Sequence, residues 1–300
     1  MAKDWESTFL TWTKPPSDTE EAKCENAVRM IREAIEADPV LSKFKIEVFA
    51  QGSYANNTNV RLNSDVDVCI RNMSVFFVDY PEGKTDSDFG ISDMSYDFSL
   101  YKTQVGTALK NHFGEKFVVP GKKAFDILEN SYRIETDAVP CFEHRRYSGT
   151  KDSQGNFYYL SGIEFRTVDI PRIISWPKQH RENGIKKNLE TGTTFKKVVR
   201  ILRRLNYDMC EKKIDATGKI TGYLIECLCW NINNPMFNSA SYVQSVKDIL
   251  GSLYNSTKDI QNVQEWGEIN ELKYLFRSSQ PWTMEDVNSW TVAAWNYLEF

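Results

Sequence analysis

Two aspartates interrupt an apolar β-strand pattern in the stretch SDVDVCI. Val66, Val68 and Ile70 alternate with polar residues, as in a strand with one buried face. Aspartate is a poor strand former. Residues two apart on a strand point to the same face, about 7 Å apart, so Asp65 and Asp67 project together. Because two such carboxylates repel unless a cation lies between them, the pattern predicts a β-sheet that carries a cation site.

A third aspartate and a Gly-Ser pair extend this prediction to phosphate chemistry. Asp137 lies in a second alternating stretch, RIETDAVPCF, and is placed to supply a third carboxylate. Mg²⁺ takes few protein carboxylates and completes its shell with water and substrate phosphates. Gly52 lets backbone N–H groups approach a phosphate, and the Ser53 hydroxyl adds a donor. The set predicts a two-metal phosphoryl-transfer site with no covalent protein intermediate.

Each motif has a purely structural interpretation when it stands alone. A D-x-D pair is more often a solvated strand edge or a turn, and a lone Gly-Ser pair is uninformative. Their order along the chain is specific: a strand, Gly-Ser, a polar spacer, D-x-D in an apolar strand, and a later acid in another apolar strand.

Composition restricts the class of protein. Hydrophobic residues make up 41% of the 300 residues, which is enough for a core. The net charge of −4 argues against a surface that binds nucleic acid throughout. Six cysteines without a C-x-x-C pair, and three histidines, predict neither a zinc site nor a disulfide framework. With no signal peptide and no long apolar run, we expect a cytoplasmic protein without membrane association.

The pattern changes from strands to helices near Pro177. We therefore expect a catalytic lobe with a mixed β-sheet over residues 1–177 and a helical lobe over residues 178–300. A helix starting at Ser17 or Asp18 could pack with either lobe. Polar residues 84–97 are typical of a mobile insertion. The other predicted helices cover 98–114, 193–211, 222–231, 239–254 and 284–300.

The motifs resemble the DNA polymerase beta-like nucleotidyltransferase superfamily, in which a Gly-Ser turn precedes D-x-D and a distal acid. Within it, GSYANNTNVRLNSDVDVCI, RIETDAVPCFEHRRY, ISWPKQHRENGIKKN and TFKKVVRILRRL resemble the CD-NTases. These are the bacterial cyclic GMP-AMP synthase-like enzymes of CBASS anti-phage systems, and the clade CdnE is the most similar. The resemblance spans about residues 49–231 and implies a bilobal α/β (α+β) enzyme.

The resemblance assigns roles to residues of the sheet lobe. Asp65, Asp67 and Asp137 match the metal-binding triad. Gly52 and Ser53 match the turn that holds the triphosphate.

It also assigns roles in the helical lobe. Lys196 matches a phosphate-binding lysine on the central helix, where the apolar stripe leaves it on another face with Arg200 and Arg203. An ordinary solvated face is the alternative for the two arginines. Tyr223 matches an aromatic residue that stacks on a nucleobase, with a buried core tyrosine as the alternative. Many relatives carry Ser just before it, where this chain has Gly222.

Base recognition has several candidates. Ser175 falls where relatives carry Ser or Asn to sense the acceptor base. In the family Asn favours a pyrimidine, so Ser175 favours a purine. Asn56, Asn57 and Asn183 are alternative candidates for base contacts.

The implied function is synthesis of a cyclic nucleotide. The enzyme would bind NTPs with Mg²⁺ or Mn²⁺ and join two or three nucleotides by attack of a ribose hydroxyl on an α-phosphate. It would release pyrophosphate and cyclise the product, which would switch on a separate effector protein during phage infection. We expect a monomer and, without a zinc insertion, no nucleic-acid activator.

Two alternatives remain open at this stage. One is a nucleotidyltransferase that modifies RNA, a protein or a small molecule. The other is a catalytically inactive nucleotide-binding scaffold, against which the presence of all three acids argues.

Overall fold

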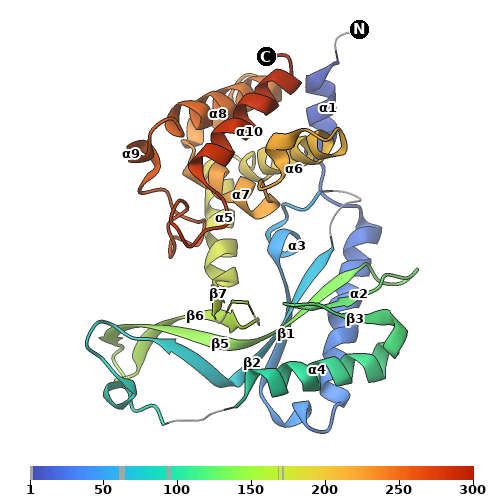
Figure 1. The fold of residues 1–300 in the computed structure, drawn as a ribbon, viewed down its shortest axis with the longest axis vertical. Helices are drawn as coiled ribbons and strands as arrows, with labels where there is room; N and C mark the ends of the chain where they lie inside the picture. The colour runs from blue at the N-terminus through green and yellow to red at the C-terminus, as the bar shows by residue number, and fades with distance from the viewer. Residues whose placement is uncertain (1–2, 61–64, 93–95, 168, 171) are drawn as a thin grey trace. The chain divides into compact units, whose positions relative to one another are not determined.

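A computed structural model describes residues 3–60, 65–92, 96–167, 169–170 and 172–300 (Figure 1). The chain folds into two compact units. The sheet unit comprises residues 18–52 and 65–178, and the helical unit comprises residues 1–17, 53–64 and 179–300. The expected lobes, 1–177 and 178–300, stay a prediction, and the two units differ from them by the placement of residues 1–17, 53–64 and 178.

The sheet unit is built on a seven-stranded mixed sheet. Its strand order is β1-β2-β5-β4-β3, while β6 pairs with β5 and β7 pairs with β6. Strands β2 and β5 are parallel, and the other pairs are antiparallel. The strands are β1 (Ile46–Gln51), β2 (Val66–Asp79), β3 (Val118–Pro120), β4 (Phe125–Ile127), β5 (Thr136–Lys151), β6 (Phe157–Phe165) and β7 (Ile173–Ser175).

Helix α4 (Phe98–Phe113) covers one face of this sheet and packs on α2 (Asp18–Ala37). The ring of Tyr101 lies 5.2 Å from that of Phe142. Gly106 leaves room for the ring of Phe125, because a Cβ there would lie 2.6 Å from that ring. Since side chains alternate along a strand, Asp137, an odd number of residues from Phe142, projects from the opposite face.

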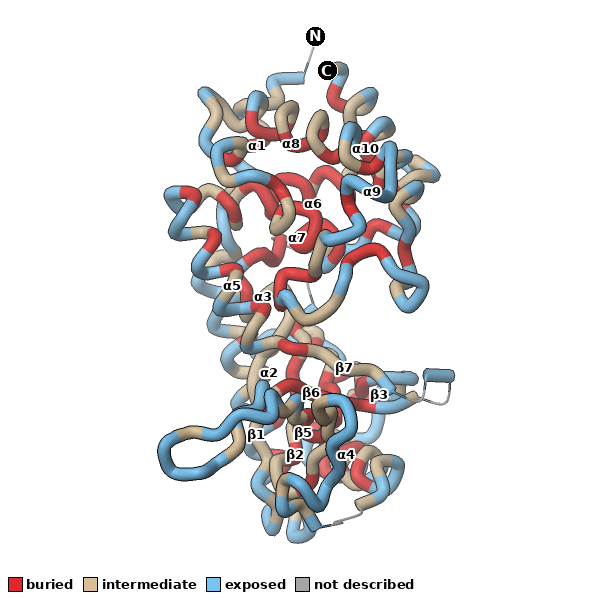
Figure 2. Tube along the Cα trace, turned by 90° about the vertical axis from the view of Figure 1, so that its left-hand side faces the viewer, coloured by how far each residue is buried: buried red, intermediate tan, exposed pale blue. Residues whose placement is uncertain are grey.

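The helical unit has one hydrophobic core (Figure 2). Helix α6 contributes the buried stripe that the periodicity predicts, whereas α7 is buried continuously from Leu224 to Cys229. Phe9 of the unpredicted helix α1 is fully buried in the same core, which explains why residues 1–17 belong to this unit. The helices are α1 (Trp5–Trp12), α5 (Pro177–Glu190), α6 (Phe195–Glu211), α7 (Gly222–Asn231), α8 (Tyr242–Ser256), α9 (Ile260–Val263) and α10 (Met284–Tyr297).

Short helices complete the two units. The α-helical turn α3 (Gly52–Asn56) follows β1 directly. The 3₁₀ helices are η1 (Leu41–Lys43), η2 (Asp86–Phe89), η3 (Glu115–Phe117), η4 (Asp215–Thr217) and η5 (Asn234–Asn238). Helix η2 lies in the predicted mobile insertion, whose residues 93–95 are outside the described residues. No helix in the described ranges combines the length and the apolar character needed to cross a bilayer.

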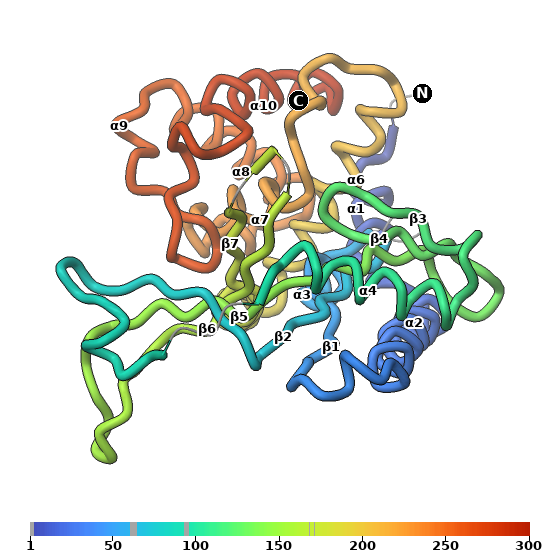
Figure 3. The backbone as a smooth tube through the Cα atoms, turned by 60° about the horizontal axis from the view of Figure 1, so that its bottom comes forward, coloured from blue at the N-terminus to red at the C-terminus, as the bar shows by residue number. Residues whose placement is uncertain are grey.

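The far ends of β2, β5 and β6 continue as a three-stranded extension of the sheet (Figure 3). An irregularity in β2 between Asn72 and Phe76 shifts its register against β5. Beyond it, Phe76 pairs with Glu143 and Asp79 with Arg146. The extension therefore lies on the strands that carry Asp67 and Asp137, but its side chains are distant from these two aspartates along the strands.

Candidate active site

The sheet aligns polar side chains in a row across four neighbouring strands. Gln51 of β1 pairs in register with Asp67 of β2. Asp67 pairs with Asp137 of β5, and Asp137 pairs with Asp126 of β4. Register partners project from the same face of a sheet. We call Asp67, Asp137 and Asp126 the acid row, and Asp65 lies one residue before β2.

Asp137 is a member of the acid row whose pKa is raised. Burial, together with the neighbouring carboxylates of Asp126, Asp65 and Glu135, raises its pKa to about 6. A bound cation would favour the ionised form and lower this pKa. Carboxylate oxygens are the ligands that hard divalent cations prefer, so the donor set fits such an ion.

The acids of the described residues do not form a complete metal-coordination site. In the part of the chain that the structure describes, no group of three or more His, Cys, Asp or Glu side chains is placed to hold a metal ion. Like charges keep carboxylates apart when no cation is bound. The roles of Asp65, Asp67 and Asp137 as metal ligands therefore stay a prediction.

Gly52 is required by the turn that follows β1. Its φ angle is +66°, in the left-handed region that favours glycine. A Cβ at this position would collide with Oδ2 of Asp67. The backbone at Gly52 thus passes directly against a carboxylate of the acid row.

Glu226 of α7 anchors the segment that follows Ser53. Its buried carboxylate accepts hydrogen bonds from Thr58 Oγ1 and from Asn56 Nδ2, the latter at 3.4 Å. It also accepts from His180 Nε2 at 2.7 Å and from Arg203 Nη1 at 3.1 Å. Burial alone would raise the pKa of Glu226, but His180, Arg203 and Thr58 outweigh it and hold this pKa below its usual value. We call these five residues the Glu226 network.

Lys196 is half-buried on α6. Burial lowers the pKa of its ammonium group, and the charges of Arg200 and Arg181 act in the same direction against the opposing charge of Glu226. Among the described residues, none accepts a hydrogen bond from Lys196 Nζ. The ammonium is therefore available for an anion.

The solvated-face interpretation is wrong for Arg200 and Arg203. Both side chains are buried. Arg200 donates to the carbonyl oxygens of Asn57 at 2.6 Å and Thr13 at 2.8 Å, while Arg203 pairs with Glu226. Helical periodicity could not reveal this, because the acceptors are distant in sequence.

Tyr223 has a fixed hydroxyl and a partly open ring. The hydroxyl donates to Glu268 Oε2 at 2.7 Å, and burial raises the pKa of this phenol. The ring lies 5.5 Å from that of His180 and 6.2 Å from that of Trp282. Since 36% of Tyr223 is exposed, the interpretation as a buried core tyrosine does not hold.

Gly222 makes room for the Glu226 network. A Cβ at this position would lie 2.7 Å from Cζ of Arg203. The serine that many relatives carry would therefore displace this guanidinium from its present place.

Ser175 is the last residue of β7 and pairs with Ile163 of β6. Its side chain is half-buried. The three asparagines proposed as alternative base readers contact protein groups instead: Asn56 belongs to the Glu226 network, Asn57 accepts from Arg200, and Asn183 donates to the Ile269 carbonyl at 2.7 Å.

The predicted site residues divide between the two units. The sheet unit holds Gly52, Asp65, Asp67, Asp137 and Ser175, and the helical unit holds Ser53, Lys196 and Tyr223. The register of the sheet brings Gly52, Asp67 and Asp137 together, whereas Ser175 lies on a strand that does not contact the acid row directly.

The sequence also has known relatives. Residues 182–299 match the family described as cGAS/DncV-like nucleotidyltransferase C-terminal helical domain. Along its whole length the chain is 46% identical to the cyclic dipyrimidine nucleotide synthase CdnE of Cecembia lonarensis, with full coverage of both chains. It is 40% identical to the cyclic dipyrimidine nucleotide synthase CdnE of Legionella pneumophila, with coverage of 100% of this chain and 99% of the relative. The chain belongs to the CdnE family of CD-NTases.

Solved CdnE structures share the fold. The Elizabethkingia meningoseptica CdnE cyclic dinucleotide synthase with GTP and Apcpp superposes with a TM-score of 0.79 at 33% identity, covering 98% of this chain and 99% of that one. The Rhodothermus marinus CdnE c-UMP-AMP synthase with Apcpp and Upnpp gives a TM-score of 0.84 at 25% identity, covering 98% and 96%. The predicted family, α/β fold class and nucleotidyltransferase activity are confirmed, and nucleotides are the substrate class.

Two features of this CdnE-family chain escaped the sequence analysis. Asp126 stands in the apolar stretch AFDIL, just as Asp137 stands in its strand. Glu226 stands in the apolar helix LIECLCW. In both cases an acid within an apolar element indicated a functional or structural role. The partners of these acids could not be predicted, because they come from tertiary contacts.

Replacing Asp137 by Asn should stabilise the metal-free protein. The raised pKa of Asp137, about 6 in the folded protein, destabilises the fold in full above pH 6. The destabilisation declines as the pH falls below 6 and disappears only below the unfolded-state pKa of about 3.9. We expect Asp137→Asn to raise the free energy of unfolding by about 1 kcal/mol at pH 8, allowing for a half-exposed group. The gain should shrink towards pH 5. Thermal unfolding in EDTA at both pH values measures it, and an equal gain at both would contradict the repulsion argument.

Replacing Glu226 by Gln should destabilise the helical unit. The substitution leaves the buried Arg203 guanidinium without its carboxylate, which typically costs about 3 kcal/mol or more. Urea unfolding followed by circular dichroism measures the loss. The matched control is Glu265→Gln at an exposed position, with a change within about 0.5 kcal/mol. Similar effects of the two variants would show that the network contributes little.

Proposed function

We propose that this CdnE-family enzyme joins NTPs into a cyclic di- or trinucleotide, releases pyrophosphate, and acts in the cytoplasm as the signal-producing enzyme of an anti-phage CBASS system. The product would act on a separate effector protein. The observation that carries the proposal is the register of Asp67 opposite Asp137 on parallel strands. The full-length relatives named as cyclic nucleotide synthases support it.

We assign Asp65, Asp67 and Asp137 to divalent cation binding, with Mg²⁺ preferred and Mn²⁺ as an alternative. When bound, the cation would neutralise phosphate charge and acidify the attacking hydroxyl. The carboxylates would also orient the ribose hydroxyl towards the α-phosphate.

The remaining assigned residues hold the nucleotide. The left-handed turn at Gly52 would present backbone N–H groups to the triphosphate, with the Ser53 hydroxyl as a further donor. Lys196 would bind phosphate through its unengaged ammonium. The partly exposed side chain of Tyr223 would stack on a base.

Two similarities give different expectations for the bases. By its likeness to the base-sensing position, Ser175 favours at least one purine. The relatives at 46% and 40% identity are named cyclic dipyrimidine nucleotide synthases, which favours two pyrimidines. We propose a purine on the strength of Ser175 and retain the pyrimidine product as the second candidate.

Removing the D-x-D carboxylates should abolish synthesis. Since metal assistance contributes several kcal/mol to phosphoryl transfer, we expect Asp65→Asn with Asp67→Asn to lower the rate by at least about 10³-fold. The measurement is thin-layer and mass analysis of products from labelled NTPs with Mg²⁺ or Mn²⁺.

The same assay separates the alternative functions. A phosphatase-resistant cyclic product made from NTPs alone would exclude an obligatory foreign acceptor. Absence of any such product in all NTP mixtures, or full activity in the double variant, would contradict the proposal. The control Glu36→Gln removes an exposed carboxylate of the sheet unit and should leave the rate unchanged.

Exchanging Ser175 for Asn should change the base. If Ser175 senses the acceptor base, we expect Ser175→Asn to shift incorporation from purine to pyrimidine by about tenfold or more. Mass spectrometry of products from all four NTPs measures the ratio, with Ser148→Asn at an exposed site of the sheet unit as control. An unchanged ratio, or a wild-type product with pyrimidines alone, would contradict the role of Ser175.

A further inference from the structure

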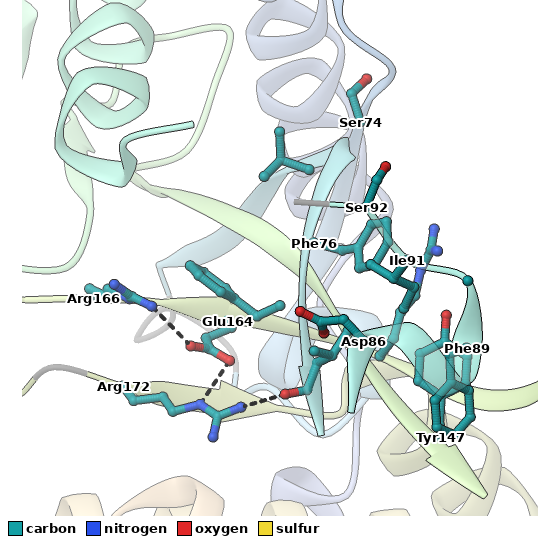
Figure 4. A pocket seen from close by; sticks show the side chains of 15 residues that line it. Ser74, Phe76, Asp86, Phe89, Ile91, Ser92, Tyr147, Glu164, Arg166 and Arg172 are labelled. Atoms are coloured by element: carbon teal, nitrogen blue, oxygen red, sulfur yellow. Dashed lines mark hydrogen bonds and ion pairs between the residues drawn. The ribbon is translucent and has the colours of Figure 1, made fainter. Parts of the chain in front are cut away.

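The extension of the sheet carries a cavity of its own (Figure 4). Its volume is about 730 Å³, within the range of small-molecule sites. Its walls come from the far part of β2, the segment around η2, and the strands β5 and β6. We call it the extension pocket, lined among others by Phe76, Phe77, Tyr147, Glu164, Arg166 and Arg172.

The extension pocket is separate from the acid row. Glu164, which lines it, pairs with Phe142, five residues after Asp137 on β5. At about 3.3 Å per residue, Phe142 and Asp137 are about 17 Å apart along the strand. A ligand in the pocket would therefore not touch the acids.

Glu164 lines the pocket and has a carboxylate oxygen that accepts no hydrogen bond from the described residues. The residue is fully buried. Its Oε2 atom is paired with His144 Nδ1 at 2.9 Å and accepts from Arg172 Nε at 3.0 Å. Its Oε1 atom has no hydrogen-bond partner among the described residues, and the Arg166 guanidinium lies 4.0 Å away. A buried carboxylate oxygen without a donor is costly, so this atom favours a ligand that brings an N–H group.

The walls favour a flat ligand. On the face of the sheet that carries Glu164, the Arg166 guanidinium lies 4.3 Å from the ring centre of Phe77. Planar guanidinium and aromatic groups of this kind stack on heterocyclic rings. The side chain of Arg166 is 49% exposed, so its donors remain accessible to an acceptor on the ligand.

From these features we infer that the extension pocket binds a guanine nucleotide by its base. Glu164 Oε1 would accept from the ring N1–H, and Arg166 would donate to the neighbouring O6, a pairing that guanidinium groups favour. Adenine has no hydrogen at N1 and no oxygen at position 6. This inference is independent of the proposed function, because it uses none of the catalytic residues.

Isothermal titration calorimetry of the full-length protein with GMP in EDTA tests the inference. We expect saturable binding of GMP below about 1 mM. AMP should bind about 10-fold or more weakly, since it leaves the Glu164 oxygen without its donor. Ribose 5-phosphate should not bind measurably.

Variants locate the site. Glu164→Gln should weaken GMP binding about 10- to 100-fold. Arg166→Gln should weaken GMP binding as well. Its side chain is half-exposed, so we expect this variant to fold. Lys151→Gln removes a positive charge from the same extension outside the pocket lining and should bind GMP as the wild type does. Thermal unfolding confirms that each variant is folded.

Three results would overturn the inference. The first is an absence of GMP binding to the wild type. The second is equal affinity for AMP or ribose 5-phosphate. The third is GMP binding that survives both Glu164→Gln and Arg166→Gln, which would place the nucleotide outside this pocket. Loss of that binding in Asp67→Asn would then place it at the acid row and leave the proposed function intact.

Discussion

The parallel pairing of β2 with β5 sets Asp67 directly opposite Asp137, and the rest of the candidate site depends on this contact. Like charges opposite each other on neighbouring strands destabilise a sheet. Here a third carboxylate, Asp126, joins from β4. A divalent cation bound with a triphosphate, as proposed above, would relieve this repulsion.

The same register positions the turn that would hold the phosphates. Gln51 ends β1 opposite Asp67, so Gly52 begins the turn against that carboxylate. Beyond Ser53 the chain is fixed by a different means, the buried carboxylate of Glu226. Hydrogen bonds to Glu226 also come from α5 and α6, so one ionised group organises the part of the helical unit that carries Lys196 and Tyr223.

The candidate site residues could be recognised in the sequence, but the contacts that support them could not. Asp65, Asp67 and Asp137 stand out because carboxylates in alternating apolar strands repel one another unless a cation is bound, and their role as metal ligands stays a prediction. Helices α2, α4 and α6 were predictable from local periodicity and capping residues. The burial of Arg200 and Arg203 and the place of α1 were not, since each depends on partners far away in sequence. The extension pocket was equally hidden, because it forms where β2 shifts register against β5.

The most direct test of the central claim is a crystal structure with Mn²⁺ and a non-hydrolysable NTP, with anomalous diffraction locating the metal. We predict an anomalous peak coordinated by carboxylate oxygens of Asp65, Asp67 and Asp137 and by the triphosphate. A peak held by other residues, with the acid row turned away from the metal and the nucleotide, would contradict the account.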